Sequence, residues 1–360
     1  MCFCVCGLVA AVLFIDHTRA FVAYFPPMNS SPTVVSTPHG FRTDLLRWRQ
    51  LVSADWLSAW LVHDGVPGEP ESVWHLFEVG CDGLHLFETG HLPGARYLDT
   101  HQFERPPFWN QTPDAALLHL LQSLGLGPDS TVILYARNTL AAARVAQLLL
   151  YAGVRDVRLL DGGLQAWCAA GYGLASGAQA PANVPVCPAP WGEAFPAYPG
   201  YCLNLAQARA LALRSDAALV SIRSHAEWMG ETSGYRYIAA RGEIDSALWG
   251  QAGRDGDINS MSSFQDAQGR MKATVEIEAV WADAGIHRDL HIAFYCGTGW
   301  RASLAFFYAW LMGWERISVF DGGWFEWSSD PGNPVVCRSE QAAFSRNVEP
   351  HGIASGHSEK

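Results

Sequence analysis

The feature that most constrains the fold is an internal repeat. Residues 131–167 and 291–327 align without a gap at an offset of 160 positions, and both copies contain Asp-Gly-Gly-x-x-x-Trp. Each copy has the pattern of a buried strand, a loop, a helix that ends at a glycine, a second short strand, and a turn into another helix. Strands that alternate with helices predict parallel sheets. We therefore expect an α/β protein with two tandem domains, each a central parallel sheet flanked by helices, with ligands bound at the C-terminal ends of the strands.

The repeat extends upstream and divides most of the chain. Trp74–Val79 and Ala218–Ile222 are apolar runs that predict a strand before each copy. A stretch rich in Ala, Pro and Gly separates the copies and is typical of a linker. We expect five parts: residues 1–42, a signal segment or a wrongly assigned start; 43–175, a first domain; 176–200, the linker; 201–338, a second domain; and 339–360, a flexible tail.

The two copies differ most in the loop after their first strand. In the second copy, a predicted strand at His291–Tyr295 leads into the loop Cys296–Arg301, and a helix is predicted over Ala302–Trp310. The first copy has Ala136–Ala141 there, which lacks the cysteine and both glycines. The same backbone element therefore folds without these residues, so function explains them better than folding does.

The residue types in this loop point to anion-binding sulfur chemistry. Free N–H groups and the dipole at a helix N-terminus form an anion site, and two glycines let several N–H groups converge. A cysteine at such a site is favoured in its thiolate form. The alternative interpretation of Cys296 is a buried cysteine with a structural role only. We expect Arg301 to contribute a permanent charge that matters more for anion binding than for folding.

Composition limits the partners. A net charge of −11 without a basic run argues against nucleic acid. The nine cysteines contain no Cys-x-x-Cys pair and the histidines have no ligand spacing, so we expect neither a metal nor a cofactor.

Cys2–Ile15 has the length of a signal h-region but no preceding Lys or Arg, so export to the periplasm is expected, with a cytoplasmic protein that starts near Met28 as the alternative. No later stretch is long enough for a membrane span.

Three motifs resemble the rhodanese family of sulfurtransferases. They are the Cys-x-x-x-x-Arg loop, the Asp-Gly-Gly turn followed by Trp, and the Gly-His-Leu-Pro-Gly-Ala element at Gly90–Ala95. The resemblance covers roughly residues 51–335 and looks closest to bacterial multidomain thiosulfate sulfurtransferases with three modules, of which two are present here. It implies that the first domain is inactive and that the second is catalytic.

The resemblance also implies a persulfide mechanism. Cys296 would take sulfur from thiosulfate or another small anionic donor and pass it to cyanide, a thiol or a sulfur-acceptor protein. The spacing of four residues between Cys296 and Arg301 favours sulfur over phosphate, because the cysteine phosphatases and arsenate reductases of this superfamily have a loop one residue longer. A persulfide carrier and, with less support, a phosphatase or arsenate reductase are the alternatives. The residues expected to bind the substrate are Gly297, Thr298, Gly299, Trp300, Arg301, Arg223 and Trp249.

Two of these candidates have a second interpretation. Arg223, at the end of a predicted strand, either binds the anion or braces the loop through a salt bridge. Trp249 either lines the pocket or packs in the core. Because the first domain lacks the nucleophile, we expect it to act as a packing partner, with the pocket at the interface of the two domains.

Overall fold

The computed structural model describes residues 40–63, 65–178, 190–192 and 194–340. The apolar segment Cys2–Ile15, part of the expected linker and residues 341–360 lie outside this range. Within it, no helix is both long enough and apolar enough to cross a membrane.

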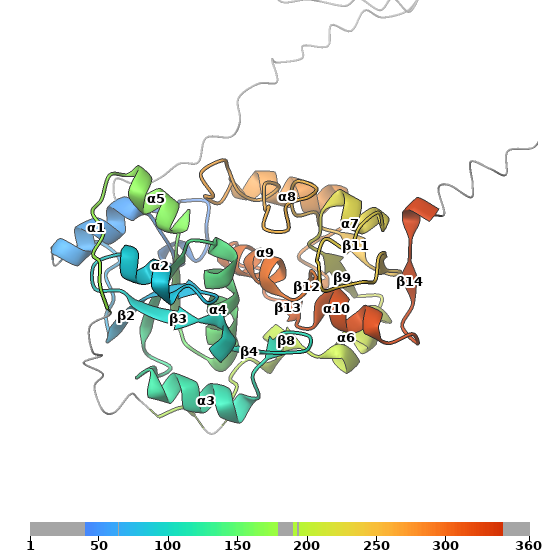
Figure 1. Ribbon diagram of the computed structural model, residues 1–360, viewed down its shortest axis with the longest axis horizontal. Coiled ribbons are helices and arrows are strands. Elements are labelled where there is room, and N and C mark those ends of the chain that lie inside the picture. Colours follow the sequence, from blue (N-terminus) through green and yellow to red (C-terminus); the bar gives the residue numbers. More distant parts are fainter. Residues whose placement is uncertain (1–39, 64, 179–189, 193, 341–360) are drawn as a thin grey trace, which may run out of the picture. The chain divides into compact units, whose positions relative to one another are not determined.

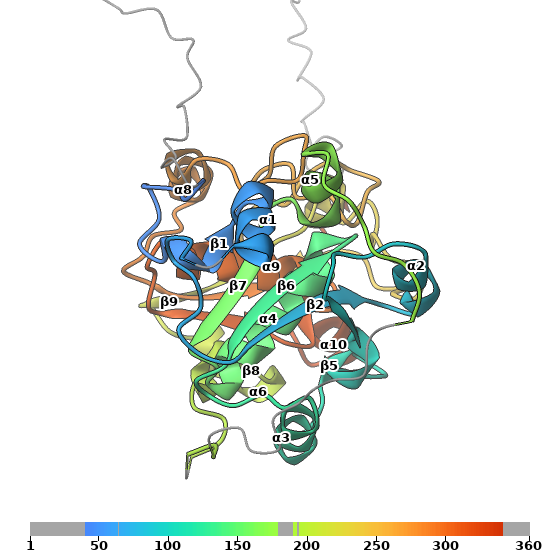
Figure 2. The ribbon, with the colours of Figure 1, turned by 90° about the vertical axis from the view of Figure 1, so that its left-hand side faces the viewer.

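The first module is a five-stranded parallel sheet in the order β1-β7-β6-β2-β3 (Figure 2). Its strands are β1 (Leu51–Val52), β2 (Trp74–Gly80), β3 (Arg96–Asp99), β6 (Thr131–Ala136) and β7 (Asp156–Leu160). Its helices are α1 (Ala54–Val62), α2 (Leu84–Thr89), α3 (Asp114–Ser123), α4 (Thr139–Ala152) and α5 (Gly163–Ala169). A short antiparallel pair, β4 (Glu104–Arg105) and β5 (Asn110–Gln111), follows β3.

The second module repeats this topology in the strand order β11-β9-β12-β13-β8. Its strands are β8 (Cys202–Leu203), β9 (Ala217–Ser221), β11 (Leu248–Trp249), β12 (His291–Tyr295) and β13 (Ile317–Phe320). Its helices are α6 (Leu205–Ala212), α7 (His225–Met229), α8 (Thr274–Asp283), α9 (Trp300–Leu311) and α10 (Gly323–Ser329). The antiparallel pair β10 (Glu243–Ile244) and β14 (Val335–Val336) completes it.

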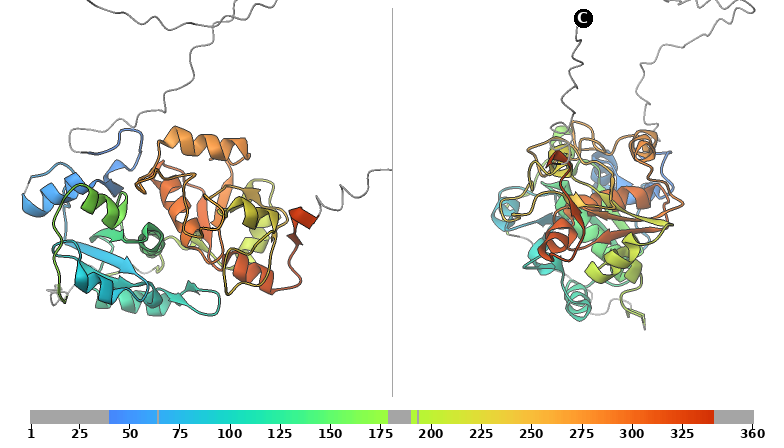
Figure 3. Two further views of the ribbon diagram at one scale, coloured as in Figure 1. Left: turned by 45° about the horizontal axis from the view of Figure 1, so that its top comes forward. Right: turned by 90° about the vertical axis from the view of Figure 1, so that its right-hand side faces the viewer.

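One hydrophobic core is shared by the two modules. Successive side chains of a strand alternate between faces, so Val132 and Leu134 of β6 enter this shared core, whereas Ile133 and Tyr135 pack with α1, α2 and α5 on the other face. The helices α3, α4, α8 and α9 all contribute to the shared core. Helices α4 and α9 contact each other, as the green and orange-red ribbons of Figures 1 and 3 show. Every residue at 140–152 and at 301–311 is buried, which explains why both helices are predominantly apolar and why the buried Arg144 and Arg301 are paired with carboxylates.

The sequence located these strands closely but placed the start of α9 incorrectly. Strand β12 has the expected bounds, β2 ends one residue later than expected, and β9 is shifted by one residue towards the N-terminus. Helix α9 begins at Trp300 rather than Ala302, so Trp300 and Arg301 belong to its first turn and not to the loop. The reason is Gly299, whose φ of 100° lets the chain turn into the helix two residues earlier.

Candidate active site

Cys296 directly follows β12, and residues 297–299 separate it from the start of α9. Its side chain is buried, with 1% exposure. The N–H of Gly299 donates a hydrogen bond to the Cys296 Sγ over 3.2 Å. The sulfur is thus placed at the positive end of a helix of twelve residues, where negative charge is stabilised.

The Asp-Gly-Gly turn holds the backbone of this loop from behind. At the start of α10, the N–H groups of Trp324 and Phe325 donate to the carbonyl oxygens of Cys296 (2.7 Å) and Gly297 (3.1 Å). A Cβ on Gly323 would lie 2.5 Å from the Cys296 oxygen, so only glycine permits this approach. Because the N–H and C=O of a trans peptide point in opposite directions, the N–H groups of Gly297 and Thr298 point away from α10. The repeated motif therefore orients the donors of the loop.

Arg301 makes a bidentate ion pair that the sequence did not reveal. Its Nη1 and Nη2 atoms each lie 2.8 Å from a carboxylate oxygen of Glu227, and Nη2 also donates to the Tyr235 hydroxyl over 2.9 Å. Arg301 is 1% exposed and Glu227 is 2% exposed. The Nε atom of Arg301 is buried without a hydrogen-bond partner in the structure. Both Nη atoms of the guanidinium therefore bind groups of the protein, whereas its Nε–H has no protein acceptor and can donate to a ligand.

Glu227 is held in its ionised form by several partners. Burial opposes its ionisation, but Arg301 and Arg223, together with the N–H of Ser224, outweigh burial and lower the pKa of Glu227 to about 2. Glu227 and Ser224 also form a capping box at the start of α7. One carboxylate thus joins α7 to the first turn of α9.

This arrangement predicts a definite pH dependence. The folded-state pKa of Glu227 lies below its ordinary value of 4.5, so its ionisation stabilises the fold fully above about pH 4.5 and progressively less as the pH falls towards 2. The difference in unfolding free energy between wild type and Glu227→Gln should therefore be constant at neutral pH and shrink below about pH 4.5. Urea denaturation at a series of pH values measures it. A difference that does not change with pH would contradict the ionised pair.

Arg223 and Trp249 lie behind the loop. Arg223 is completely buried and donates to the carbonyl oxygens of Gly242 (2.7 Å) and Ser233 (3.1 Å). Its guanidinium also pairs with Glu227. The indole N–H of Trp249 donates to the Arg223 carbonyl over 3.0 Å. Neither residue is among those that line the cavity described below, and Arg223 is connected to the start of α9 through Glu227, which also pairs with Arg301.

The first module reaches the loop through Glu104. The indole N–H of Trp300 donates to one carboxylate oxygen of Glu104 over 2.9 Å, and the Nε of Arg144 donates to the other over 2.7 Å. Arg144 also pairs with Asp321 of the Asp-Gly-Gly turn. Glu104, Arg144 and Asp321 are all buried. A charged network therefore connects α4 of the first module to the first turn of α9 and to the Asp-Gly-Gly turn of the second.

A cavity of about 260 Å³ opens beside the loop, between residues of the two modules. Aromatic rings form much of its wall. One of them, Tyr235, lies so close to the loop that a Cβ on Gly297 would be 2.3 Å from its ring. Sequence reasoning identified three lining residues in α9 and its loop but missed the rest. The Gly-Glu-Thr-Ser-Gly-Tyr stretch that ends at Tyr235 was the one available signal. The lining residues are Cys81, Thr100, His101, Glu104, Trp109, Leu140, Tyr235, Tyr237, Ile258, Asn259, Thr298, Trp300 and Arg301.

Comparison with known proteins agrees with this geometry. The model of the Rhodanese-like domain matches residues 73–170 and 205–330, which are the two modules. The chain belongs to the rhodanese family. Its first rhodanese module has Ala136 where the second has Cys296, so only the second has a cysteine at this position.

Several relatives of this rhodanese protein have names that concern sulfur. It is 46% identical over 292 residues to the thiosulfate sulfurtransferase YnjE of Escherichia coli, covering 81% of this chain and 66% of that protein. It therefore spans slightly less than two thirds of that relative. It is 29% identical over 301 residues to the sulfur carrier protein TtuD of Thermus thermophilus, covering 79% of this chain and 96% of TtuD.

Solved structures show the same rhodanese arrangement. The crystal structure of YnjE superposes with a TM-score of 0.77 at 45% identity, covering 81% of this chain and 69% of that one. An anaerobic ergothioneine biosynthesis enzyme from Chlorobium limicola, in complex with its natural substrate trimethyl histidine, superposes with a TM-score of 0.75 at 36% identity. That match covers 81% of this chain and 71% of the enzyme.

Proposed function

We propose that the protein is a sulfurtransferase that moves a sulfane sulfur from thiosulfate, or a similar small anionic donor, to a thiophilic acceptor. The observation that carries this proposal is the Cys296 sulfur itself, which accepts the Gly299 N–H at the start of α9. The relatives named for thiosulfate sulfur transfer and sulfur carriage support it.

The proposed reaction has two displacement steps. The Cys296 thiolate attacks the outer sulfur of thiosulfate, the sulfur–sulfur bond of the donor breaks, and sulfite leaves with the bonding electrons. The new bond makes a Cys296 persulfide. An acceptor such as cyanide then attacks the outer sulfur, leaves as thiocyanate and regenerates the thiolate, which is ping-pong catalysis. No oxidant or reductant is consumed.

The loop supplies the groups that this reaction needs. We propose that the N–H groups of Gly297, Thr298 and Gly299 stabilise the anionic sulfur, in the way that an oxyanion hole stabilises oxygen. The unpartnered Nε of Arg301 is a further donor at the cavity wall. Trp300 forms part of the same wall. We assign to Arg223 a bracing role, which its contacts with Glu227 and with the carbonyl oxygen of Gly242 support.

Mass spectrometry of the intact protein after incubation with thiosulfate tests this proposal. We expect one added sulfur atom on the Cys296 peptide, and its removal by cyanide with release of thiocyanate. Sulfur that is loaded but not turned over with cyanide would favour the persulfide carrier. Failure to load sulfur, with release of phosphate from an aryl phosphate, would favour the phosphatase alternative.

The cavity favours a second candidate for the acceptor. Trp109, Tyr235, Tyr237 and Trp300 are among the residues that line it. Aromatic faces attract quaternary ammonium groups, and trimethyl histidine is the substrate of the Chlorobium limicola enzyme. We therefore propose small acceptors with a quaternary ammonium as alternatives to thiols and cyanide.

Calorimetric titration with trimethyl histidine tests this second candidate. Binding should weaken at least tenfold in Trp109→Ala, because the cavity loses one of the aromatic rings that would contact the quaternary ammonium. Trp191→Phe, a change outside the lining residues, is the matched control. Absence of binding to the wild-type protein would restrict the acceptors to thiophiles.

A nucleophile added to the first module should remain inactive. In a Cys296→Ser background, Ala136→Cys is expected to restore no thiosulfate:cyanide activity. Ala136 is buried, the following loop has no glycine, and the side chain of Asn138 already accepts the Leu140 N–H over 3.2 Å. The new thiol would therefore lack converging donors. Steady-state rates above those of the Cys296→Ser protein would contradict this expectation.

Two further expectations stay predictions. They are the export of the chain, which depends on Cys2–Ile15, and the division into domains at residues 43–175 and 201–338. Fractionation of cells that express the full chain tests the first, and limited proteolysis followed by mass spectrometry of the fragments tests the second.

A further inference from the structure

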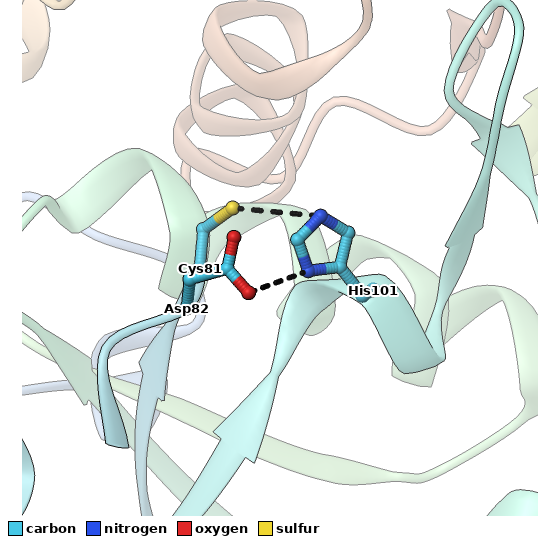
Figure 4. Close-up of side chains that lie close together, drawn as sticks. All are labelled: Cys81, Asp82 and His101. Carbon is cyan, nitrogen blue, oxygen red and sulfur yellow. Dashed lines mark hydrogen bonds and ion pairs between the residues drawn. The ribbon is translucent and has the colours of Figure 1, made fainter. Parts of the chain in front are cut away.

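Three potential metal ligands meet at the edge of the first sheet. Cys81 and Asp82 directly follow β2, and His101 lies in a 3-10 turn (Thr100–Gln102) that directly follows β3. Because β2 and β3 are parallel neighbours, their C-terminal ends meet at one edge. The Cys81 Sγ lies 3.9 Å from the His101 Nε2, and one ligand atom of each of the three residues lies within 4.8 Å of the others (Figure 4).

A carboxylate orients the imidazole. Asp99 lies 3.0 Å from the His101 Nδ1. It is itself fixed, because it accepts the Tyr97 hydroxyl over 3.0 Å and the Asp82 N–H over 2.9 Å. An Nδ1 proton shared with Asp99 leaves the lone pair on Nε2, the nitrogen that faces Cys81. Metal-binding histidines are oriented by carboxylates in this way.

The charge at this edge favours a cation over a second sulfur anion. Asp82, Asp99 and Glu104 all act on Cys81 through their negative charge. Glu104 is paired with Arg144, but among the ion pairs of the described residues Asp82 and Asp99 have only His101 as a partner. These carboxylates would repel an anionic persulfide on Cys81, so we do not place a sulfur relay there. A divalent cation would be attracted by the same groups.

We propose that Cys81, His101 and Asp82 form a binding site for a thiophilic divalent cation such as Zn²⁺. Tetrahedral zinc, with a Zn–S distance of about 2.3 Å and a Zn–N distance of about 2.0 Å, separates sulfur and nitrogen by roughly 3.6 Å. The Cys81–His101 pair therefore needs to close by only a few tenths of an ångström, whereas the Asp82 carboxylate, which lies 3.6 Å from the His101 Nδ1, has to turn towards Nε2 to join them. Three protein ligands leave a position for water or for a thiolate from outside.

The site adjoins the sulfur chemistry without being part of it. Cys81 and His101 line the same cavity as Thr298 and Trp300 of the Cys296 loop and its helix. A thiol acceptor bound to the ion would thus enter the cavity that the loop faces. The sequence alone did not suggest this site, because twenty residues separate Cys81 from His101 and only the pairing of β2 with β3 brings them together.

Cobalt spectroscopy of the full chain tests the site. Co²⁺ replaces Zn²⁺ in such sites and gives a thiolate-to-metal absorption band in the near ultraviolet. All proteins carry Cys296→Ser, so that the loop thiol cannot contribute. We expect Cys81→Ser to remove this band and His101→Ala to weaken Co²⁺ binding at least tenfold. Cys168→Ser, which removes another exposed free cysteine, is the matched control and should leave the band unchanged.

Further variants keep the proposal falsifiable. Asp99→Asn should weaken Co²⁺ binding 10–100-fold while Cys81 and His101 remain, as expected for a group that positions a ligand. Thermal unfolding without metal should be alike in all variants, which separates ligand loss from misfolding. No band in the parent protein, or a band of equal intensity in Cys81→Ser, would overturn the proposal. Because no readout uses sulfur transfer, failure here is distinct from failure of the proposed function.

Discussion

Replacing Cys296 with serine is expected to abolish sulfur transfer and leave the fold intact. A serine hydroxyl has no accessible anion near neutral pH and cannot form a persulfide. The change is nearly isosteric, and the hydroxyl oxygen can still accept the Gly299 N–H that Cys296 accepts over 3.2 Å. The thiosulfate:cyanide rate should fall to that of the reaction without protein, whereas the melting temperature should barely move.

Cys168→Ser provides the control for this experiment. Cys168 is an exposed free cysteine on α5 and does not line the cavity. Its replacement should leave the rate unchanged, which shows that a thiol elsewhere does not carry the activity. Substantial turnover by the Cys296→Ser protein would refute the assignment of Cys296 as the nucleophile.

Replacing Arg301 with alanine is expected to destabilise the protein strongly, which revises the expectation from the sequence. A cysteine loop that ends in arginine suggests a role mainly in anion binding. The structure shows that both Nη atoms bind the buried carboxylate of Glu227. Breaking a buried pair by removing one partner costs about 3–5 kcal/mol, because the remaining charge is left without compensation. Urea denaturation at pH 7 measures this loss.

The Glu227→Gln substitution distinguishes the stability that comes from the Arg301–Glu227 ion pair from the other contributions of Arg301. In the double variant Arg301→Ala/Glu227→Gln, no unpaired carboxylate remains, so the loss should be clearly smaller than the sum of the two single losses. Arg301→Lys keeps a charge but not the two parallel hydrogen bonds, and should fall between wild type and Arg301→Ala. Additive losses would show that the two side chains do not stabilise each other.

The sequence predicted the elements whose signals are local. The apolar run His291–Tyr295 predicted β12 with its bounds, and the repeat predicted two sheets of the same kind. The loop after β12 was identifiable because the first copy lacks its cysteine and glycines. In each case the information lies within a few residues or in a direct comparison of the two copies.

The parts that the sequence did not predict depend on contacts between distant residues. Glu104 lies 196 positions before Trp300, its partner at the site, and Arg144 lies 177 positions before Asp321. Neither carboxylate belongs to a motif that indicates a partner. Arg301 was recognised, but its partner Glu227 lies 74 positions earlier, at the start of α7. Periodicity and spacing contain no information on such contacts.

The network of Glu104, Arg144 and Asp321 gives the first module, which lacks the cysteine, a structural role beside the Cys296 loop of the second. The first module has Ala136 where the second has Cys296. Here its α4 holds the Asp-Gly-Gly turn of the other copy, and its Glu104 holds the tryptophan next to the reactive loop. A substitution at these positions in one module is therefore expected to alter the surroundings of the loop in the other, so the two copies depend on each other although their sequences have diverged.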